Sequence, residues 1–549
     1  MSQKTSEFEP AIRRLERQAA ELIHKDTDLL TAVCGLTFSD TPISGTAANE
    51  WDAQYEYRPM IRAFYCKELA GFATTELYEY LADAERASTL GFDPNQFAPD
   101  KMAPGRTTLG RAWRDRFTDR LKSFITQSAQ RILAVAHDMG NPLGMRALEP
   151  TDKSNSSNRT ERRYVTEKAK DVTDALCQIV FPAIDLDRPK EGTQYADTAF
   201  LDLQSYLGLT GTAANQGSQM FDEETTREAG GPAGDTHLQY IKQLDAMEIA
   251  SMVNGAIGEM VWAAEQYYSI DRHADVAIDI TYVAYYGDRD EFQMSTGAPP
   301  SKSYSWCYKM ATISVVGEEV KFTLGMRPLR GYIPRSVLVE KLLDIASDHV
   351  SLGTVYADAE FDGIGVINAL EEKRLSYLIR KSSDNRVDRF VAAMDHEVAV
   401  KQSHEMEKTS GGESVTVTPT LVGVPSTRKE DTTVMFVTNL QVSDGTKAAR
   451  GRTRRIIGRY ARRWGIENSY KSIKDFLAWT TSRNTAVRVF YFGFAVILYD
   501  MWLVVDLLVQ ISLDIEQRLK PRVPARTFLN IVRKEMPVTW RSAGRNADS

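Results

Sequence analysis

The sequence predicts an α/β domain in the second half of the chain, preceded by a mainly α-helical region. Up to about residue 270 the apolar residues recur with helical spacing, and from residue 274 strand-like apolar runs alternate with shorter helices. Two of these runs contain or end in an aspartate, Asp279 and Asp358. The chain has 549 residues, of which 43% are hydrophobic, so it is long enough for two or three domains with a sizeable core.

The first 150 residues have the pattern of a helical region. Residues 58–69 and 74–85 are predicted helices, and a third is predicted from Thr107 to Lys122. This third helix is rich in arginine, and Arg111 and Arg114 are among the residues we expect to contact DNA. Short helices followed by an arginine-rich one are typical of a helix-turn-helix DNA-binding domain. A plain helical bundle with solvated arginines explains the same segment equally well.

The predicted α/β domain begins after residue 270. The order β-β-β-α-β-α-β is that of an RNase H-like domain, with predicted strands at 274–287, 303–316, 318–328, 352–361 and 375–382 and predicted helices at 334–349 and 363–374. Two further runs, 414–425 and 431–442, alternate well enough to predict a β-rich antiparallel insertion.

Composition and periodicity divide the chain into six segments. The predicted boundaries are 1–150 for the helical DNA-binding region, 151–270 for a linker and a second helical region, 271–381 for the first part of the RNase H-like catalytic core, 382–446 for the β-rich insertion, 447–520 for the basic and apolar helices that complete the core, and 521–549 for a C-terminal tail.

The two strand aspartates predict a site for divalent cations. Asp279 lies inside the apolar run VAIDITYV, where an ionised carboxylate is costly unless it is paired, hydrogen-bonded or bound to a metal. Asp358 follows the run TVYA, at the carboxyl end of a strand, where open α/β sheets place their active sites. Two such carboxylates can share Mg²⁺ ions, which act on phosphoryl groups. Either aspartate alone could equally be a capping or structural residue, and Glu360 and Asp362 are the nearest substitutes for Asp358.

A third acidic residue lies within a basic segment. Tyr460, Arg463, Glu467 and Lys474 fall within about 60° of one another on a single α-helix, at about 100° per residue. This stripe places one carboxylate among donors that suit phosphates. The alternative is a helical salt bridge between Arg463 and Glu467, which accounts for only two of the four residues.

The charge distribution also favours a polyanionic partner. The net charge is −7, yet the segment from Lys447 to Lys474 contains ten basic residues and a single acid, Glu467. Such a block in an acidic chain is typical of a phosphate-binding surface, and a solvated helix face is the alternative.

Together these residues resemble a known family. The pattern Tyr460-x2-Arg463-x3-Glu467-x6-Lys474 resembles the signature of a large group of bacterial and archaeal insertion-sequence transposases with a DDE RNase H-like domain. Asp279 in AIDITYVAYYG and Asp358 in YADAEFDG resemble the first and second catalytic aspartates of this group, and GRTTLGRAWRDRF resembles its N-terminal DNA-binding helices. Several segments resemble haloarchaeal members. Ala359 departs from the pattern, because the family often has arginine after the second aspartate.

The resemblance implies a DNA transposase of a mobile element. Such an enzyme binds terminal inverted repeats in double-stranded DNA, cleaves the ends of the element, joins them to target DNA, and acts as a homodimer in the synaptic complex. The resemblance implies two Mg²⁺ ions, for which Mn²⁺ can substitute, held by Asp279, Asp358 and Glu467. It implies contacts with DNA near the cleaved end from Tyr460, Arg463 and Lys474.

Two other functions remain open on the sequence alone: a DNA-binding regulator derived from an inactivated transposase, and a structure-specific nuclease with an RNase H-like fold. Four scattered cysteines fit a reducing cytoplasm, so we expect a cytoplasmic, nucleoid-associated protein. The apolar run 489–509 has the length of a membrane span, but Asp500 and Asp506 lie inside it, and we expect a buried core helix and no membrane partner.

Overall fold

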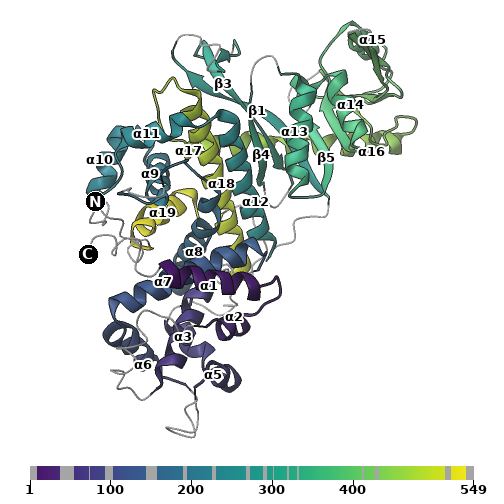
Figure 1. Cartoon of the computed structure of the whole chain (residues 1–549). Helices are drawn as coiled ribbons and strands as arrows, with labels where there is room; N and C mark the ends of the chain where they lie inside the picture. Colours follow the sequence, from purple (N-terminus) through teal and green to yellow (C-terminus); the bar gives the residue numbers. More distant parts are fainter. Residues whose placement is uncertain are drawn as a thin grey trace.

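The computed structural model describes the chain in sixteen stretches: residues 9–37, 55–72, 74–92, 103–141, 143, 158–189, 194–224, 230–266, 273–287, 294–300, 302–317, 321–329, 333–410, 413–426, 432–513 and 521–539. Within them, a helical N-terminal region is followed by a mixed α/β sheet domain with further helices packed against it (Figure 1).

The N-terminal helices enclose a hydrophobic core of their own. Its largest buried residues include Phe64 and Phe124. The helices are α1 (Glu9–Leu22), α2 (Leu29–Gly35), α3 (Tyr57–Ala70), α4 (Thr74–Tyr80), α5 (Ala84–Leu90), α6 (Arg106–Arg111) and α7 (Asp119–Asp138). In Figure 1 this region lies at the opposite end of the molecule from the sheet.

The predicted arginine-rich helix from Thr107 to Lys122 is wrong as a single helix. α6 ends at Arg111, a π-helical turn follows from Ala112 to Arg116, and Phe117 is extended, with φ −75° and ψ 124°. The ring of Phe117 packs edge-on against Phe64, with centroids 5.0 Å apart, which fixes the chain in this kink. The Thr118 hydroxyl then accepts a hydrogen bond from the Leu121 N–H, 3.2 Å away, and caps the new helix α7.

A second set of helices covers the sheet domain. It comprises α8 (Asn158–Val180), α9 (Asp197–Thr210), α10 (Ala214–Glu224), α11 (Gly234–Gln243) and α12 (Ala246–Glu265). α8 begins at Asn158, inside the predicted linker, whose residues 151–157 lie outside the described stretches. Asp245 caps α12 through a reciprocal capping box with Glu248.

In the part of the chain that the structure describes, nine strands form one sheet in the order β2-β3-β1-β5-β6-β11-β10-β7, and β4 also pairs with β3. β1 pairs in parallel with β5, and β5 in parallel with β6, while the other pairs are antiparallel. The strands are β1 (Ala274–Tyr285), β2 (Thr296–Gly297), β3 (Trp306–Val315), β4 (Thr323–Leu329), β5 (Leu352–Ala357), β6 (Ser376–Arg380), β7 (Ala399–Lys401), β10 (Thr420–Pro425) and β11 (Thr433–Thr438).

The five strands and two helices predicted between residues 274 and 382 are present. The helices are α13 (Arg335–Ser347) and α14 (Ile364–Glu372). The antiparallel strands predicted beyond residue 382 are also present, but β11 and β10 continue the main sheet through the pairing of β11 with β6. This pairing satisfies the backbone groups that β6 would otherwise expose at an edge. Only the hairpin of β8 (Met406–Ser410) and β9 (Glu413–Val417) forms a separate small sheet among the described residues.

The long apolar helix α18 (Thr485–Ser512) lies in the core. It is the one described helix that is long and apolar enough to cross a membrane, and 89% of its most apolar stretch is buried inside the protein. Its two aspartates have partners there: Asp500 accepts from the Thr323 N–H at 3.1 Å, and Asp506 accepts from the Val523 N–H at 2.7 Å. The prediction of a buried core helix is confirmed.

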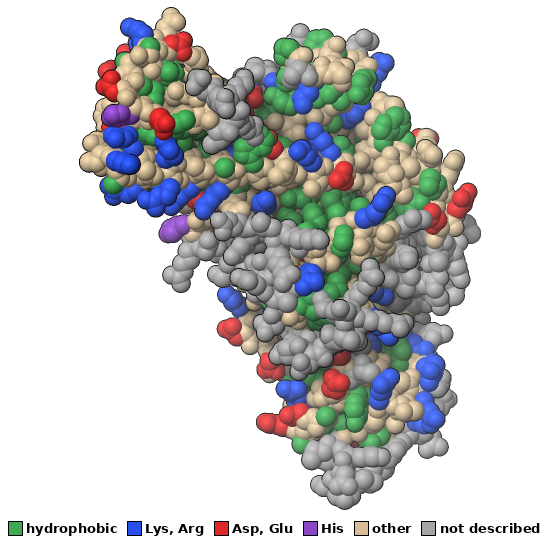
Figure 2. All heavy atoms as spheres, turned by 180° about the vertical axis from the view of Figure 1, so that it is seen from behind, with side chains coloured by type: hydrophobic (Ala, Val, Ile, Leu, Met, Phe, Trp, Pro, Cys, Tyr) green, Lys and Arg blue, Asp and Glu red, His purple; other side chains and the backbone are tan. Residues whose placement is uncertain are grey.

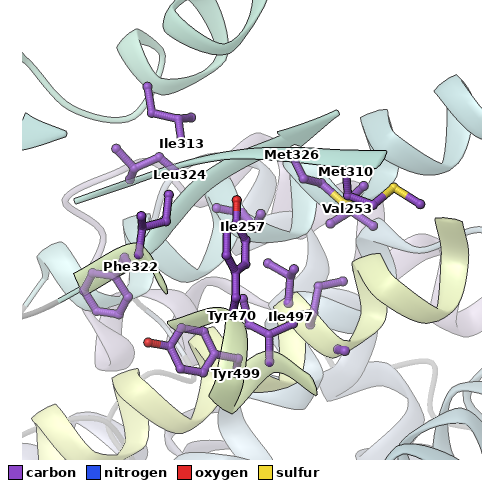
Figure 3. Packing of buried hydrophobic residues seen from close by; sticks show 14 of the residues in the cluster. Val253, Ile257, Met310, Ile313, Phe322, Leu324, Met326, Tyr470, Ile497 and Tyr499 are labelled. Carbon is purple, nitrogen blue, oxygen red and sulfur yellow. The ribbon is translucent and has the colours of Figure 1, made fainter. Parts of the chain in front are cut away.

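One hydrophobic core joins the sheet, α12, α18 and the helix α17 (Trp464–Asp475). Figure 3 shows Val253 and Ile257 of α12 close to Met326 of β4, with Tyr470 of α17 and Ile497 of α18 on the other side. The helix that carries Glu467 is therefore fixed against the sheet that carries Asp279 and Asp358.

Candidate active site

Asp279 and Asp358 are neighbours on two parallel strands. Ile278 of β1 is paired with Ala357 of β5, and each aspartate is the next residue along the chain. β5 ends at Ala357, whereas β1 continues to Tyr285, so the sheet is open beside Asp279 at this point. The side-by-side position of these two aspartates is the one that the sequence predicts.

The Asp279 carboxylate is buried and only partly compensated. Its side chain is 13% exposed, and Oδ1 accepts a hydrogen bond from the Ile280 N–H at 2.8 Å. Arg463 Nη1 lies 3.4 Å from Oδ2. Burial raises the pKa of Asp279 to about 7, Arg463 opposes this rise, and the charge of Asp358 adds to it. The positive charge of Arg463 is therefore too small to offset the cost of burying an ionised Asp279 carboxylate.

Asp358 caps the short 3₁₀ segment η4 (Ala359–Phe361), and its Oδ1 accepts from the Glu360 N–H at 2.9 Å. The capping role is thus real, but burial still raises the pKa of Asp358, and the charges of Glu360 and Glu467 add to the rise. A capping role requires one carboxylate here, and it does not explain why Asp358 lies close to the charges of Glu360 and Glu467.

Glu467 is linked to Asp279 through Arg463. Arg463 Nη2 lies 2.6 Å from Glu467 Oε1, while Nη1 of the same guanidinium faces Asp279. Arg463 is buried, at 8% exposure, and its guanidinium lies 5.5 Å from the centre of the Tyr460 ring. The Tyr460 hydroxyl donates to the carbonyl of Ala357, 3.2 Å away. We call Asp279, Asp358 and Glu467 the carboxylate cluster.

The helix that carries Glu467 is less regular than predicted. The prediction of one α-helix from Tyr460 to Lys474 is wrong, because η5 (Arg459–Arg463) is a 3₁₀ segment and α17 begins at Trp464. With three residues per turn, η5 places Tyr460 and Arg463 on the same side. The helical salt bridge from Arg463 to Glu467 is present, but Arg463 also reaches the strand.

A second arginine fastens η5 to the same strand. Arg462 Nη1 lies 2.9 Å from Asp275 Oδ2, and Asp275 also accepts from the Thr354 N–H and the Tyr356 hydroxyl. Asp275 and Asp279 lie four residues apart on β1 and so point to the same face of the sheet. We did not predict the contact between Arg462 and Asp275, although this spacing of the two aspartates could have indicated it.

Tyr470 is a further residue that the sequence analysis missed. Its hydroxyl donates to the backbone carbonyl of Asp279 at 2.8 Å and shares a hydrogen bond with the Thr312 hydroxyl at 2.8 Å. Tyr470 is buried one turn after Glu467 on α17 (Figure 3). An aromatic residue at this spacing, on the inward face of the predicted helix, was the available signal.

Two nearby acids point away from the cluster, as predicted. Glu360 is held by Arg335 Nη2 at 2.5 Å and by the Tyr282 hydroxyl at 3.3 Å. Asp362 is buried and paired with Lys381 at 2.9 Å. Neither side chain is left to act in place of Asp358.

Lys474 lies two turns beyond Glu467 on α17. Among the described residues no hydrogen bond or ion pair joins it to the carboxylate cluster. Partial burial of its ammonium group, together with the charge of nearby Lys302, lowers the pKa of Lys474. Two neighbouring lysines that no ion pair joins to a carboxylate among the described residues favour an anionic ligand at this position.

The donor chemistry of the cluster fits hard divalent cations. Its three groups are carboxylates, the oxygen ligands that such cations prefer. Burial raises the pKa values of Asp279 and Asp358, and neighbouring carboxylates add to the rise. In the described stretches, however, no three acidic, histidine or cysteine side chains lie close enough to hold one ion. The Arg463 guanidinium instead holds Asp279 and Glu467 together. Asp279 and Glu467 are therefore linked, but the three predicted ligands are not arranged around a common ion position.

The predicted DNA-binding arginines of the N-terminal region lie on the surface. Arg111 and Arg114 are exposed, and the Lys122 ammonium donates to the backbone carbonyl of Arg114 at 3.4 Å. α6 lies far from β1 and β5 in Figure 1. These arginines therefore lie far from the carboxylate cluster.

Comparison with known proteins adds a family match over the segment that contains the site. Residues 276–499, a segment that contains the whole carboxylate cluster, match the family model described as "Transposase DDE domain". Among solved structures, the chain is similar to a piggyBac transposase in a cryo-EM synaptic complex with hairpin DNA, with a TM-score of 0.44 and 12% identity, over 72% of this chain and 84% of the other. No curated protein sequence matches the chain.

Proposed function

We propose that this protein is a DDE transposase that binds the terminal inverted repeats of an insertion sequence and catalyses metal-dependent cleavage and transfer of DNA strands. The observation that carries the proposal is the position of Asp279 beside Asp358 on parallel strands, with Glu467 linked to Asp279 through Arg463. All three residues lie in the segment that matches the transposase DDE domain. The order of strands and helices from β1 to β6 supports an RNase H-like fold for this segment.

The carboxylate cluster would hold two Mg²⁺ ions, or Mn²⁺ in their place. Such ions, when bound, stabilise the attacking and leaving oxygens of a phosphoryl transfer. The role of the surrounding residues is to hold the carboxylates in position: Tyr470 fixes the backbone at Asp279, and Arg462 fixes η5 to β1. Arg463 presents a planar set of donors beside them, which suits a phosphate oxygen of the scissile strand.

DNA is the partner that the surrounding charges favour. Tyr460 and Arg463 flank the cluster, and Lys474 with Lys302 forms a cationic pair further along α17. We propose that these residues bind the cleaved end, that the N-terminal region with Arg111 and Arg114 binds the repeat, and that two copies act together in the synaptic complex. Such a substrate places the protein in the cytoplasm with the nucleoid.

The test is cleavage of DNA that carries the element's own ends. Glu467→Gln keeps the size of the side chain and removes the charge that holds a cation. We expect it to bind the ends as tightly as the wild type while Mg²⁺-dependent nicking falls by at least ~10³, about 4 kcal/mol of transition-state stabilisation. Asp475→Asn, an exposed acid on the same helix, is the matched control and should cut normally.

Three results would redirect the proposal. If Glu467→Gln cuts as well as the wild type, the catalytic role of this residue is wrong. If the wild type binds its ends tightly and does not cut them with Mg²⁺ or Mn²⁺, the protein is a DNA-binding regulator. If it cuts branched DNA of any sequence in preference to the ends, it is a structure-specific nuclease.

A further inference from the structure

The helix α16 (Lys447–Gly458) has one buried face and one strongly basic face. Thr446 caps it by accepting from the Ala449 N–H. Its buried residues, Ala449, Thr453 and Ile457, are spaced four apart and lie on the inner side. The Thr453 hydroxyl also donates to the Ser443 carbonyl at 2.8 Å, so this side is fixed to the protein.

The opposite face of α16 carries only basic and small side chains. At about 100° per residue, five exposed cations lie within about 80° of the direction opposite the buried residues. They are Lys447, Arg452, Arg454 and Arg455 of α16 and Arg459 at the start of η5. The helix contains no acidic residue. Figure 2 shows a row of Lys and Arg side chains along the edge of the lobe formed by α14, α15 (Asn385–Ala392) and α16.

These cations are mostly unneutralised. Arg454 is paired with Glu397 at 2.5 Å, and both side chains are exposed. In the parts of the chain that the structure describes, no carboxylate pairs with Lys447, Arg452 or Arg455. Like charges on one helix face repel each other, so the arrangement is destabilising unless an anionic ligand covers it.

Two glycines lie between the arginines on this outer face. Gly451 and Gly458 have helical backbone and open space around them, since a Cβ on either would meet nothing within 4 Å. Glycine within a helix costs about 1 kcal/mol relative to alanine, and no neighbouring atom in the described part of the chain requires it here. Together with exposed Ala448, the glycines leave the helix backbone accessible between longer basic side chains. A sugar–phosphate backbone can therefore approach the helix closely at this place.

The basic face leads directly to the carboxylate cluster. Arg459 is followed by Tyr460, which contacts the residue before Asp358, and then by Arg463, which contacts Asp279. The 12 residues of α16 extend about 18 Å, equal to about five base pairs of duplex DNA at 3.4 Å each.

We propose that the outer face of α16 binds the phosphate backbone of duplex DNA over about five base pairs beside the cleavage point. The choice of DNA rests on the proposed transposase function, whereas the binding of a phosphate backbone rests on the charges and the glycines of α16. The contact is independent of base sequence, because it reads the backbone alone.

The first test removes charge. The double variant Arg452→Gln/Arg455→Gln should bind a duplex of unrelated sequence about tenfold or more weakly at 0.1 M salt, with the slope of log affinity against log salt reduced by about two. The control, Lys242→Gln/Lys408→Gln, removes two exposed cations from α11 and β8 and should leave the slope unchanged.

The second test places a larger side chain at one of the two glycines on the outer face of α16. Gly451→Leu should make α16 more stable, because leucine favours helix, yet it should weaken duplex binding without changing the salt slope. Thermal unfolding of each variant shows that the fold is retained. Wild-type affinity and slope in both α16 variants would overturn the proposal. If the α16 variants lose as much affinity for duplex RNA as for duplex DNA, relative to the wild type, the choice of DNA would be overturned.

Cleavage of the element's ends separates this proposal from the transposase function. If the wild type cuts and the double variant keeps the wild-type salt slope, the function stands and the α16 surface is wrong. If the wild type does not cut but the double variant has a reduced slope of log affinity against log salt, the α16 surface binds the phosphate backbone and the catalytic function is wrong.

Discussion

Asparagine in place of Asp279 should stabilise the cation-free protein at pH 8, although Asp279 lies in the sheet. The folded-state pKa of Asp279 is about 7, compared with 3.8 for a free side chain. The folded protein therefore holds this proton more tightly than the unfolded chain does. The associated stability is fully present below about pH 4 and is lost as the pH rises to about 7. This rise in pKa corresponds to about 4 kcal/mol, at about 1.4 kcal/mol for each pKa unit.

Urea unfolding at pH 5 and pH 8 with a chelator present measures this effect. At pH 8, Asp279→Asn should be more stable than the wild type by up to about 4 kcal/mol, and at pH 5 the difference should be much smaller. Asp275→Asn is the matched control on the same strand. Because Asp275 accepts from Thr354, Tyr356 and Arg462, its variant should instead be less stable by about 1–3 kcal/mol.

Divalent cations provide the complementary measurement. Mg²⁺ should raise the unfolding temperature of the wild type at pH 8 and have little effect on Asp279→Asn, because only the wild type has the ionised group that the cation would neutralise. The reasoning is refuted if Asp279→Asn is no more stable than the wild type at pH 8. That result would mean that Arg463 already neutralises the Asp279 carboxylate in the folded protein.

Three further predictions concern other parts of the chain. Arg111→Ala/Arg114→Ala should weaken metal-independent binding of the element's ends and lower the salt slope by about one for each lost phosphate contact; an unchanged slope would show a solvated surface. Lys474→Ala should raise the DNA concentration needed for half-maximal cleavage more than it lowers the maximal rate, whereas a fall in rate alone would contradict a DNA-binding role. Gly208→Ala should destabilise the protein by about 1–3 kcal/mol in urea unfolding, because its Cβ would lie 2.5 Å from the carbonyl oxygen of Phe476 beyond the end of α17; wild-type stability would mean that α9 can shift away.

The strands and the two aspartates were predictable because their signals are local. Continuous apolar runs predicted β1 and β5 as buried strands, and the cost of burying a carboxylate singled out Asp279 within its strand. Parallel pairing of β1 with β5 then places Asp279 beside Asp358, as the sequence analysis expected. The helix containing Glu467 was also predictable, because the spacing of its residues is helical.

The remaining features depend on contacts between distant residues. The 3₁₀ turn of η5 follows from the pairing of Arg462 and Arg463 with β1, which lies more than 180 residues earlier. The kink at Phe117 follows from its packing on Phe64, and a helical pattern alone does not show it. The place of Arg463 between Asp279 and Glu467 was likewise not predictable, since the helical spacing indicates a bridge to Glu467 and does not indicate the strand.

The 3₁₀ winding of η5 sets the angle between two functional surfaces. A 3₁₀ segment turns about 120° and rises about 2.0 Å per residue, compared with about 100° and 1.5 Å in an α-helix. If the five residues of η5 wound as an α-helix, α16 would rotate by about 100° relative to Glu467 and move about 2.5 Å closer to it. The basic face of α16 would then stand at a different angle to the carboxylate cluster. The length and winding of η5 therefore determine how α16 is rotated relative to Glu467. A one-residue insertion or deletion in η5 should misalign the basic face of α16 and the carboxylate cluster even if both remain folded.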